Sequence, residues 1–373
     1  MRVDGSPDLS QPEPEPEPHP DPAAGRRPRL TPAIADVRRA VREALAAAAA
    51  LPEPDAHDDH GPERPHPLTP GALVMVGLSG GADSLALAAA TAFEAPRAGF
   101  RAGAVIVDHG LQAGSADVAA RAARQAAELG LDPVIVETVT VSRGESGPEA
   151  DARAARHAAF DRARAAAGPQ RILLAHTLDD QAETVLLGLA RGSGPTSLQG
   201  MLPDTGTLLR PLLAIRRETT RAFCDDSALV AWDDPHNDDP AYARVRVRAA
   251  VLPALERELG PGVAEALART ADQLREDNEA LDGLALDWAL ELVSQTDDGH
   301  VALDVRGLAS DPPALRQRII RLVVSAEFGV SLSRAHTLAV ADLITHWHGQ
   351  KSLSLPGVRV VRQNGLLIFS SQT

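Results

Sequence analysis

The chain has 373 residues, of which 44% are hydrophobic and only 3% aromatic, so its cores must consist mainly of Ala, Leu and Val. This length is enough for two domains. The formal net charge of −14 argues against a general polyanion binder but allows a local basic face. Cys224 is the only cysteine, which excludes a disulfide framework or a Cys-x-x-Cys site within one chain. We find neither a signal-peptide core nor an apolar run of about 18 residues, and therefore expect a cytoplasmic protein without a membrane span.

The first 70 residues divide into a tail, a helix and a linker. Residues 1–30 are rich in Pro and acidic residues, and we expect them to form a disordered tail. Thr31 followed by Pro32 is typical of a helix start, and apolar residues at helical spacing predict an amphipathic helix over 32–50. A Pro/His/Asp-rich linker completes the segment 31–70.

Strands alternate with helices from residue 71 to about residue 240. Helices are predicted after the Gly-Gly turn at 80–81 and at 115–129, 148–167 and 178–190. The predicted strands are 73–78, 104–107, 133–138, 172–175 and 208–213, and Pro211 suggests that the last one lies at an edge. This alternation predicts an α/β fold with a doubly wound parallel sheet of about five strands. Ligands of such sheets bind beyond the C-terminal strand ends.

Beyond residue 240 the alternation stops. Helices are predicted at 244–258, 262–295, 312–327 and 332–346. A hairpin of 352–361 and 366–369 is predicted to turn at Asn364-Gly365. We therefore expect residues 241–373 to form a second, mostly helical domain with a small sheet.

The most informative stretch joins a short apolar strand to an Ala/Leu-rich helix, and reads Ser79-Gly80-Gly81-Ala82-Asp83-Ser84. Its glycines let the backbone turn sharply beside a ligand, and the free N–H groups of a helix start bind anions, above all phosphate. The two serines add hydroxyl donors. It is not a Walker A loop, because no Gly-Lys-Ser/Thr follows, and Lys351 is the only lysine of the chain.

Polar side chains also follow two other predicted strands. Asp108 and His109 come after the strand at 104–107, and His176 comes after the one at 172–175. At each of the two strand ends, these residues could simply form an ordinary polar turn. At strand ends beside a phosphate loop, however, either imidazole could donate a hydrogen bond to charge developing on phosphate.

Asp180 and Glu183 stand three residues apart at the start of the next helix, so they share one helical face. Carboxylates in a first turn also complement the helix dipole, which is the structural alternative. Beside the phosphate loop, a carboxylate pair would hold Mg²⁺ or an ammonium group.

Four arginines form a basic group: Arg191, Arg244, Arg246 and Arg248. Arg191 stands at a predicted helix end, where it could simply satisfy carbonyl groups. The other three could be a solvated face, or could contact the phosphates of an RNA backbone.

Taken together, these motifs resemble those of the tRNA(Ile)-lysidine synthetase family, within the PP-loop ATP pyrophosphatases. They are Ser-Gly-Gly-Ala-Asp-Ser, Val-Asp-His-Gly-Leu, Leu-Asp-Asp-Gln-Ala-Glu-Thr, Arg-Gly-Ser-Gly and Asn-Asp-Asp-Pro-x-Tyr-x-Arg-x-Arg-x-Arg, within residues 72–258. The resemblance implies ATP-dependent ligation of free L-lysine to carbon 2 of the wobble cytidine in tRNA(Ile) with a CAU anticodon. An adenylated tRNA is the implied intermediate, and AMP and pyrophosphate are the implied products.

The resemblance also implies roles for individual residues. ATP would be held by Ser79, Gly80, Gly81, Ala82, Asp83, Ser84, Asp108, His109 and His176. Asp83 would also approach Mg²⁺, and Asp180 and Glu183 would bind lysine. Phosphate or tRNA contacts would come from Arg191, Arg244, Arg246 and Arg248. ATP and Mg²⁺ are thus the expected cofactors, tRNA(Ile) and L-lysine the expected partners, and a homodimer stays open.

The chain departs from the family pattern at Thr177, where many relatives have a second histidine, and at Val245, where they often have asparagine. Two alternatives stay open. One is another PP-loop tRNA-modifying enzyme such as a thiolase, although such enzymes typically need more cysteines than Cys224 alone. The other is a catalytically inactive nucleotide-binding regulator, against which the intact set of Asp83, Asp180 and Glu183 speaks.

Overall fold

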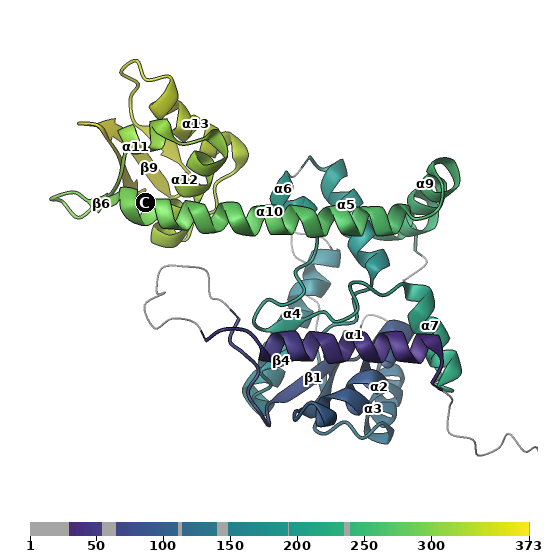
Figure 1. Cartoon of the computed structure of the whole chain (residues 1–373). Helices are drawn as coiled ribbons and strands as arrows, with labels where there is room; N and C mark the ends of the chain where they lie inside the picture. Colours follow the sequence, from purple (N-terminus) through teal and green to yellow (C-terminus); the bar gives the residue numbers. More distant parts are fainter. Residues whose placement is uncertain are drawn as a thin grey trace, which may run out of the picture.

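The structure is a computed structural model that describes residues 30–53, 65–110, 114–139, 148–192, 194–234 and 239–372. The predicted tail up to residue 29, the middle of the predicted linker and the Pro-His-Asn-Asp stretch at 235–238 lie outside the described residues. Figure 1 shows two modules connected by one long helix, α10 (Val263–Leu292).

The first module is built on a five-stranded sheet in the order β3-β2-β1-β4-β5, and every neighbouring pair is parallel. Its strands are β1 (Leu73–Gly77), β2 (Arg101–Asp108), β3 (Val134–Thr138), β4 (Arg171–Leu173) and β5 (Leu208–Leu209). The chain winds from β1 outward to β3 and then returns to the other side of β1, so the strand order reverses beside β1. Such a reversal point is where ligands bind in this class of sheet. The predicted α/β doubly wound fold is confirmed.

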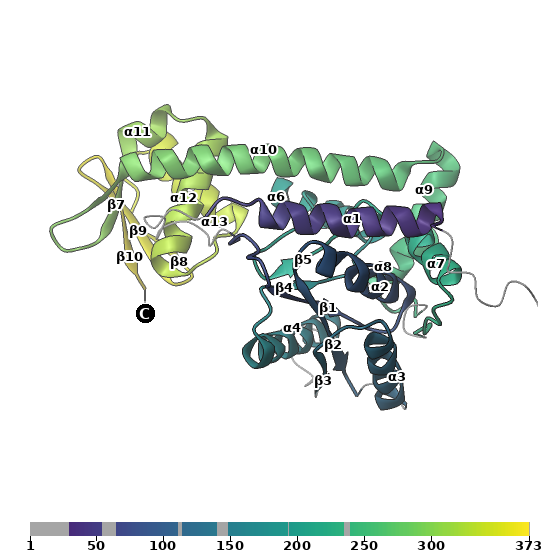
Figure 2. The same ribbon diagram turned by 60° about the horizontal axis from the view of Figure 1, so that its bottom comes forward.

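Helices cover both faces of this sheet (Figure 2). On one face Val74 and Val76 of β1 pack into a core with α1 (Pro32–Ala49), α2 (Ala82–Arg97), α3 (Ser115–Glu128) and α7 (Arg217–Asp226). On the other face Leu73 and Met75 pack against α4 (Pro148–Ala167). The alternation follows from the two-residue period of a strand. The sequence did not predict α7.

A group of helices connects the sheet to the rest of the chain: α5 (Leu178–Ala190), α6 (Pro195–Leu198), α8 (Ala243–Arg246), the π-helix η2 (Val247–Val251) and α9 (Leu252–Leu259). Leu178 and Ala182 of α5 form a small core with Val247, Leu252 and the first turns of α10. With 30 residues, α10 is roughly 45 Å long. No helix in the described ranges combines the length and apolar character needed to cross a membrane.

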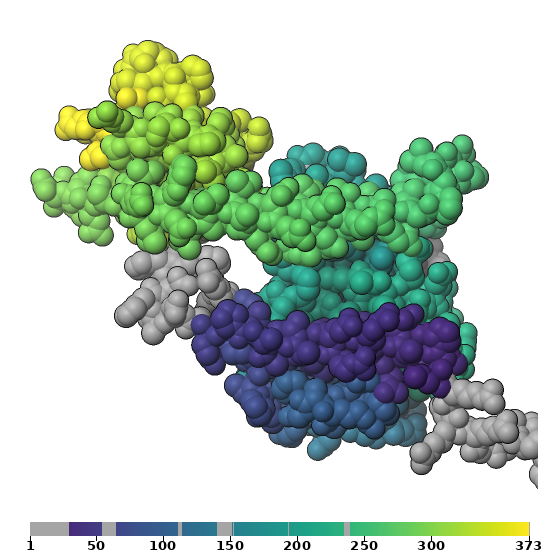
Figure 3. Space-filling model, in the orientation of Figure 1, coloured from purple at the N-terminus to yellow at the C-terminus, as the bar shows by residue number. Residues whose placement is uncertain are grey.

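The C-terminal module contains a second five-stranded sheet, antiparallel, in the order β6-β7-β10-β9-β8. Its elements are β6 (Val293–Gln295), β7 (Val301–Asp304), α11 (Val305–Ser310), α12 (Pro313–Phe328), α13 (Arg334–Thr345), β8 (Leu353–Leu355), β9 (Val358–Gln363) and β10 (Leu366–Ser371). These residues gather at one end of the space-filling view (Figure 3).

The predicted hairpin is present as β9 and β10, and both turn residues, Asn364 and Gly365, have positive φ. The predicted strand over 352–361, however, is two strands. Gly357, with φ 73°, reverses the chain between β8 and β9. The sequence also missed β6 and β7, so the sheet is larger than expected.

Candidate functional site

The loop after β1 has the geometry of an anion site. Gly80 has φ 87°, a conformation that L side chains rarely adopt. The Ser84 hydroxyl donates to the Gly81 carbonyl at 2.9 Å and accepts the Ser79 N–H at 3.2 Å, which holds the loop closed. Ala82 is the first residue of α2, whose start no side chain caps. The first N–H groups of α2 therefore remain available to an anion.

The neighbouring strand ends bring two imidazoles to the same rim. Asp108 ends β2 and accepts the Gly110 N–H at 3.0 Å, which shapes the turn around His109. The Nδ1 atoms of His109 and His176 are buried and have no hydrogen-bond partner among the described residues. Burial lowers the pKa of both, that of His176 to about 4. Both rings are therefore neutral at pH 7, and each has one nitrogen able to donate.

The carboxylates of α5 are anchored by its first turn. Thr177 is the N-cap, and the Asp180 Oδ2 atom accepts its N–H at 2.8 Å and its hydroxyl at 2.9 Å. This capping box fixes Asp180, so Thr177 has a structural role. Glu183, three residues on, is fully buried.

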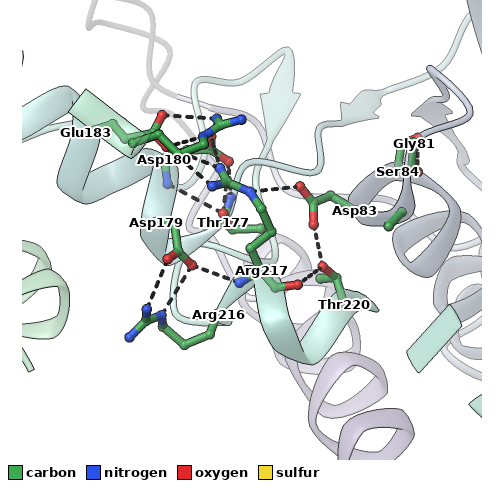
Figure 4. A network of polar contacts seen from close by, with 12 residues as sticks. Gly81, Asp83, Ser84, Thr177, Asp179, Asp180, Glu183, Arg216, Arg217 and Thr220 are labelled. Atoms are coloured by element: carbon green, nitrogen blue, oxygen red, sulfur yellow. Dashed lines mark hydrogen bonds and ion pairs between the residues drawn. The ribbon is translucent and has the colours of Figure 1, made fainter. Parts of the chain in front are cut away.

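Arg217, the first residue of α7, reaches three carboxylates at once (Figure 4). Its guanidinium lies 2.7 Å from Asp180 Oδ1, 3.3 Å from Glu183 Oε1 and 3.5 Å from Asp83 Oδ2. Thr220, one turn on, also donates to Asp83. Burial raises the pKa of the Asp83 carboxyl above its ordinary value. Burial would also raise the pKa of Asp180, but Arg217 and the Thr177 N–H hold it below its ordinary value.

The four arginines singled out in the sequence lie in two different environments, two of them near Glu183 and two exposed. Arg248 donates to both Glu183 oxygens at 2.7 and 3.2 Å, and Arg244 Nε lies 3.5 Å from Glu183 Oε2. Arg246 is exposed and donates to the carbonyls of Pro240 and Ala241. Arg191 is exposed at the far end of α5, roughly 20 Å along the helix axis from its start. The structure thus brings two of the four into contact with Glu183.

Sequence reasoning missed Arg217, its neighbour Arg216 and Thr220. Arg216 pairs with Asp179 at 3.1 Å, and this ion pair fastens the start of α7 to the start of α5. A signal was present, because Thr220, Phe223 and Cys224 are spaced as one buried helical face and all three are buried. A ten-residue helix offers too few such positions to stand out.

A cavity of about 150 Å³ adjoins this network. It is lined by Asp179, Glu183, Arg216, Arg217, Arg248, Leu252, Pro253, Glu256 and Ala264. Leu252, Pro253 and Ala264 provide an apolar wall, and the remaining residues provide both signs of charge. Such a lining suits a molecule with a short apolar chain and charged ends.

The described residues contain no group of three or more His, Cys, Asp and Glu that could hold a metal ion alone. Mg²⁺ is commonly bound by one or two carboxylates together with substrate phosphates. Asp83 lies in the first turn of α2, directly after the anion loop. Asp83 is therefore suited to bind a Mg²⁺ ion that is also coordinated by a phosphate at the loop.

Comparison with known proteins agrees with this geometry. A family model described as the PP-loop domain matches residues 64–255, and one described as the TilS substrate binding domain matches residues 303–368. In fold, the chain is similar to the U34-tRNA thiolase NcsA from Methanococcus maripaludis, solved with its [4Fe-4S] cluster. The TM-score is 0.50 and the identity 19%, over 65% of this chain and 80% of that chain. That likeness supports the fold alone.

Two curated relatives are much closer in sequence. The tRNA(Ile)-lysidine synthase of Leifsonia xyli subsp. xyli is 78% identical over 333 residues, which are 89% of this chain and all of the relative. The tRNA(Ile)-lysidine synthase of Streptomyces coelicolor is 51% identical over 82% of this chain and 86% of its own length. The resemblance found in the sequence motifs is confirmed, and the chain belongs to the tRNA(Ile)-lysidine synthase family.

Proposed function

We propose that this chain ligates free L-lysine to carbon 2 of the wobble cytidine of tRNA(Ile) with a CAU anticodon, in two steps. The observation that carries the proposal is that the phosphate loop and the buried carboxylate pair are connected through a single side chain. Arg217 touches both Asp83, at the phosphate loop, and the buried pair Asp180 and Glu183. An activated base held at the loop would therefore lie close to an amine held at the pair.

In the first step, oxygen 2 of the cytosine attacks the α-phosphorus of ATP and pyrophosphate leaves. The loop N–H groups, that of Ser84 among them, and the hydroxyl of Ser79 hold the phosphates, while the Ser84 hydroxyl keeps the loop closed. His109 and His176, both neutral, donate to the charge that develops on them. Mg²⁺, held by Asp83 and the phosphates, would supply further charge neutralisation.

In the second step, the ε-amine of lysine attacks carbon 2 and AMP leaves. The amine arrives as an ammonium with a pKa of about 10.4, and Asp180 and Glu183 bind and orient it. One of them, or the leaving phosphate, takes its proton before the attack. The methylenes of lysine lie along the wall of Leu252, Pro253 and Ala264 in the neighbouring cavity.

We propose that residues 71–240 are the catalytic domain and that residues 241–373 bind the tRNA. Residues 301–373 carry eight Arg and Lys against four Asp and Glu, in a chain with a net charge of −14. Residues 241–300 carry six Arg against twelve Asp and Glu, so the excess of positive charge that favours an RNA backbone lies within residues 301–373. Among the four arginines singled out in the sequence, Arg191 and Arg246 are exposed and suit RNA contact, whereas Arg244 and Arg248 suit the catalytic pocket. The cytoplasm is the proposed compartment.

The test is a reaction of the chain with the tRNA(Ile) transcript, Mg²⁺, lysine and ATP labelled at the α-phosphate. We expect AMP and pyrophosphate as products and one lysine joined to each modified tRNA. Without lysine, an adenylated tRNA should accumulate. ADP and phosphate as products, or sulfur incorporation in place of lysine, would contradict the proposal, and the absence of any turnover would favour the inactive regulator.

A further inference from the structure

The two carboxylates proposed to bind lysine have no free oxygen in this structure. Asp180 Oδ2 accepts from Thr177, and its Oδ1 accepts from Arg217 at 2.7 Å. Glu183 Oε1 accepts from Arg248 at 2.7 Å and Oε2 at 3.2 Å. An ammonium that binds between the two carboxylates would compete with these arginines for the same oxygens. Displacement of one arginine would clear a carboxylate for the ammonium.

The local charge is already balanced. The carboxylates of Asp83, Asp180 and Glu183 face the guanidiniums of Arg217, Arg244 and Arg248, three charges against three. A lysine ammonium would add a fourth positive charge to a largely buried group, and an uncompensated charge in such a place is unfavourable. The phosphates of a nucleotide at the loop supply the missing negative charge.

Arg217 is the arginine best placed to respond to that nucleotide. Of the three guanidiniums that surround Glu183, that of Arg217 also forms an ion pair with Asp83 at the loop, at 3.5 Å. It begins α7, which packs against α2, the helix that follows the loop. A phosphate is also a strong, bidentate acceptor for a guanidinium.

We propose that Arg217 is a displaceable internal counter-ion that makes lysine bind after the nucleotide. Without nucleotide it covers Asp180 and Glu183 in place of the ammonium. With nucleotide it turns toward the phosphates and uncovers the pair. This inference rests on the proposed function, because it takes lysine as the ligand of the two carboxylates.

The test is lysine binding by calorimetry with and without Mg²⁺ and α,β-methylene-ATP, which cannot be cleaved between the α and β positions. For the unaltered chain we expect the nucleotide analogue to tighten lysine binding at least tenfold. Lysine should tighten binding of the analogue by the same factor, because coupling is reciprocal. In Arg217→Met the coupling should fall below twofold, with lysine binding close to its tight value in both conditions.

Arg221→Met is the matched control, since Arg221 lies exposed on the same helix, and it should keep the coupling of the unaltered chain. Equal lysine affinity with and without the analogue in the unaltered chain would overturn the inference without any variant. So would weaker lysine binding by Arg217→Met in both conditions, which would make Arg217 a lysine contact or a support of the fold. If lysine still joins the tRNA, those results leave the proposed function intact; if no lysine is incorporated, the proposed function itself fails.

Discussion

The change Glu183→Gln separates the two proposed half-reactions, because it preserves size and removes one buried charge. Glu183 is fully buried and contacts Arg217, Arg248 and Arg244 at 3.3, 2.7 and 3.5 Å. Removing one partner from a buried ion pair costs about 3–5 kcal/mol. The arginine side chains keep 16–31% exposure, so solvent screening favours the lower end, about 3 kcal/mol. We expect Tm to fall by roughly 6–12 °C, at about 2–4 °C per kcal/mol for a domain of this size.

The kinetic consequence should be confined to the second step. Glutamine cannot pair with an ammonium as a carboxylate does, so the KM for lysine should rise and the transfer rate should fall, each by about tenfold or more, since charged hydrogen bonds contribute roughly 1.5–3 kcal/mol. Adenylation should persist, because the polar partners of Glu183 among the described residues are arginines outside the loop.

The assay is a single turnover with labelled ATP, in which adenylated tRNA is trapped by omitting lysine. Asp83→Asn should abolish this intermediate, and Glu218→Gln, an exposed carboxylate on α7, should leave both steps unchanged. If Glu183→Gln removes the adenylated tRNA as completely as Asp83→Asn does, Glu183 belongs to the nucleotide site and the lysine assignment is wrong.

Three further predictions address other parts of the molecule. Gly80→Ala places a Cβ at φ 87° and should weaken ATP binding at least tenfold in a nucleotide-binding assay; an unchanged ATP affinity would show that the loop tolerates the strain. Arg246→Ala should weaken tRNA binding and lower its salt slope by about one unit, with ATP affinity unchanged; equal loss of both would place Arg246 in the catalytic pocket. The folded-state pKa of His176 is lowered to about 4, so the unfolded chain binds more protons below about pH 6.5, and stability should fall as the pH drops from there toward 4. In His176→Gln the Tm should fall less steeply between pH 6.5 and 4 than in the unaltered chain. If the two curves of Tm against pH are identical, other groups cause the loss of stability in acid.

The parallel sheet and its rim could be predicted because buried strands and strand ends leave local marks in the sequence. Asp83, His176 and Asp180 each follow or begin an element with a clear pattern, and the topology then brings them to one edge. Each of these positions could be found without knowing any long-range contact.

The charge network could not be predicted in the same way. Arg217 reaches Asp83 across more than 130 positions of sequence, and no local pattern encodes such a pairing. In the sequence, Arg248 fits a run of RNA-binding arginines as well as it fits a partner for Glu183. The contact with Glu183 is visible in the folded structure alone. In the C-terminal module, β6 is exposed at all three positions and so carries no hydrophobic alternation to detect.

The long helix α10 connects the small cavity beside Glu183 to the C-terminal module. Near its start, Ala264 lines the cavity beside Glu183, and Glu256 accepts the N–H groups of Gly262 and Ala264. At its other end the chain passes directly into β6 of the C-terminal module. A straight helix of this length acts as a lever, and a tilt of 5° about its start would carry the far end by roughly 4 Å. A force from an RNA bound to the C-terminal module would therefore be transmitted along α10 to its first turn, which forms part of the wall of the small cavity.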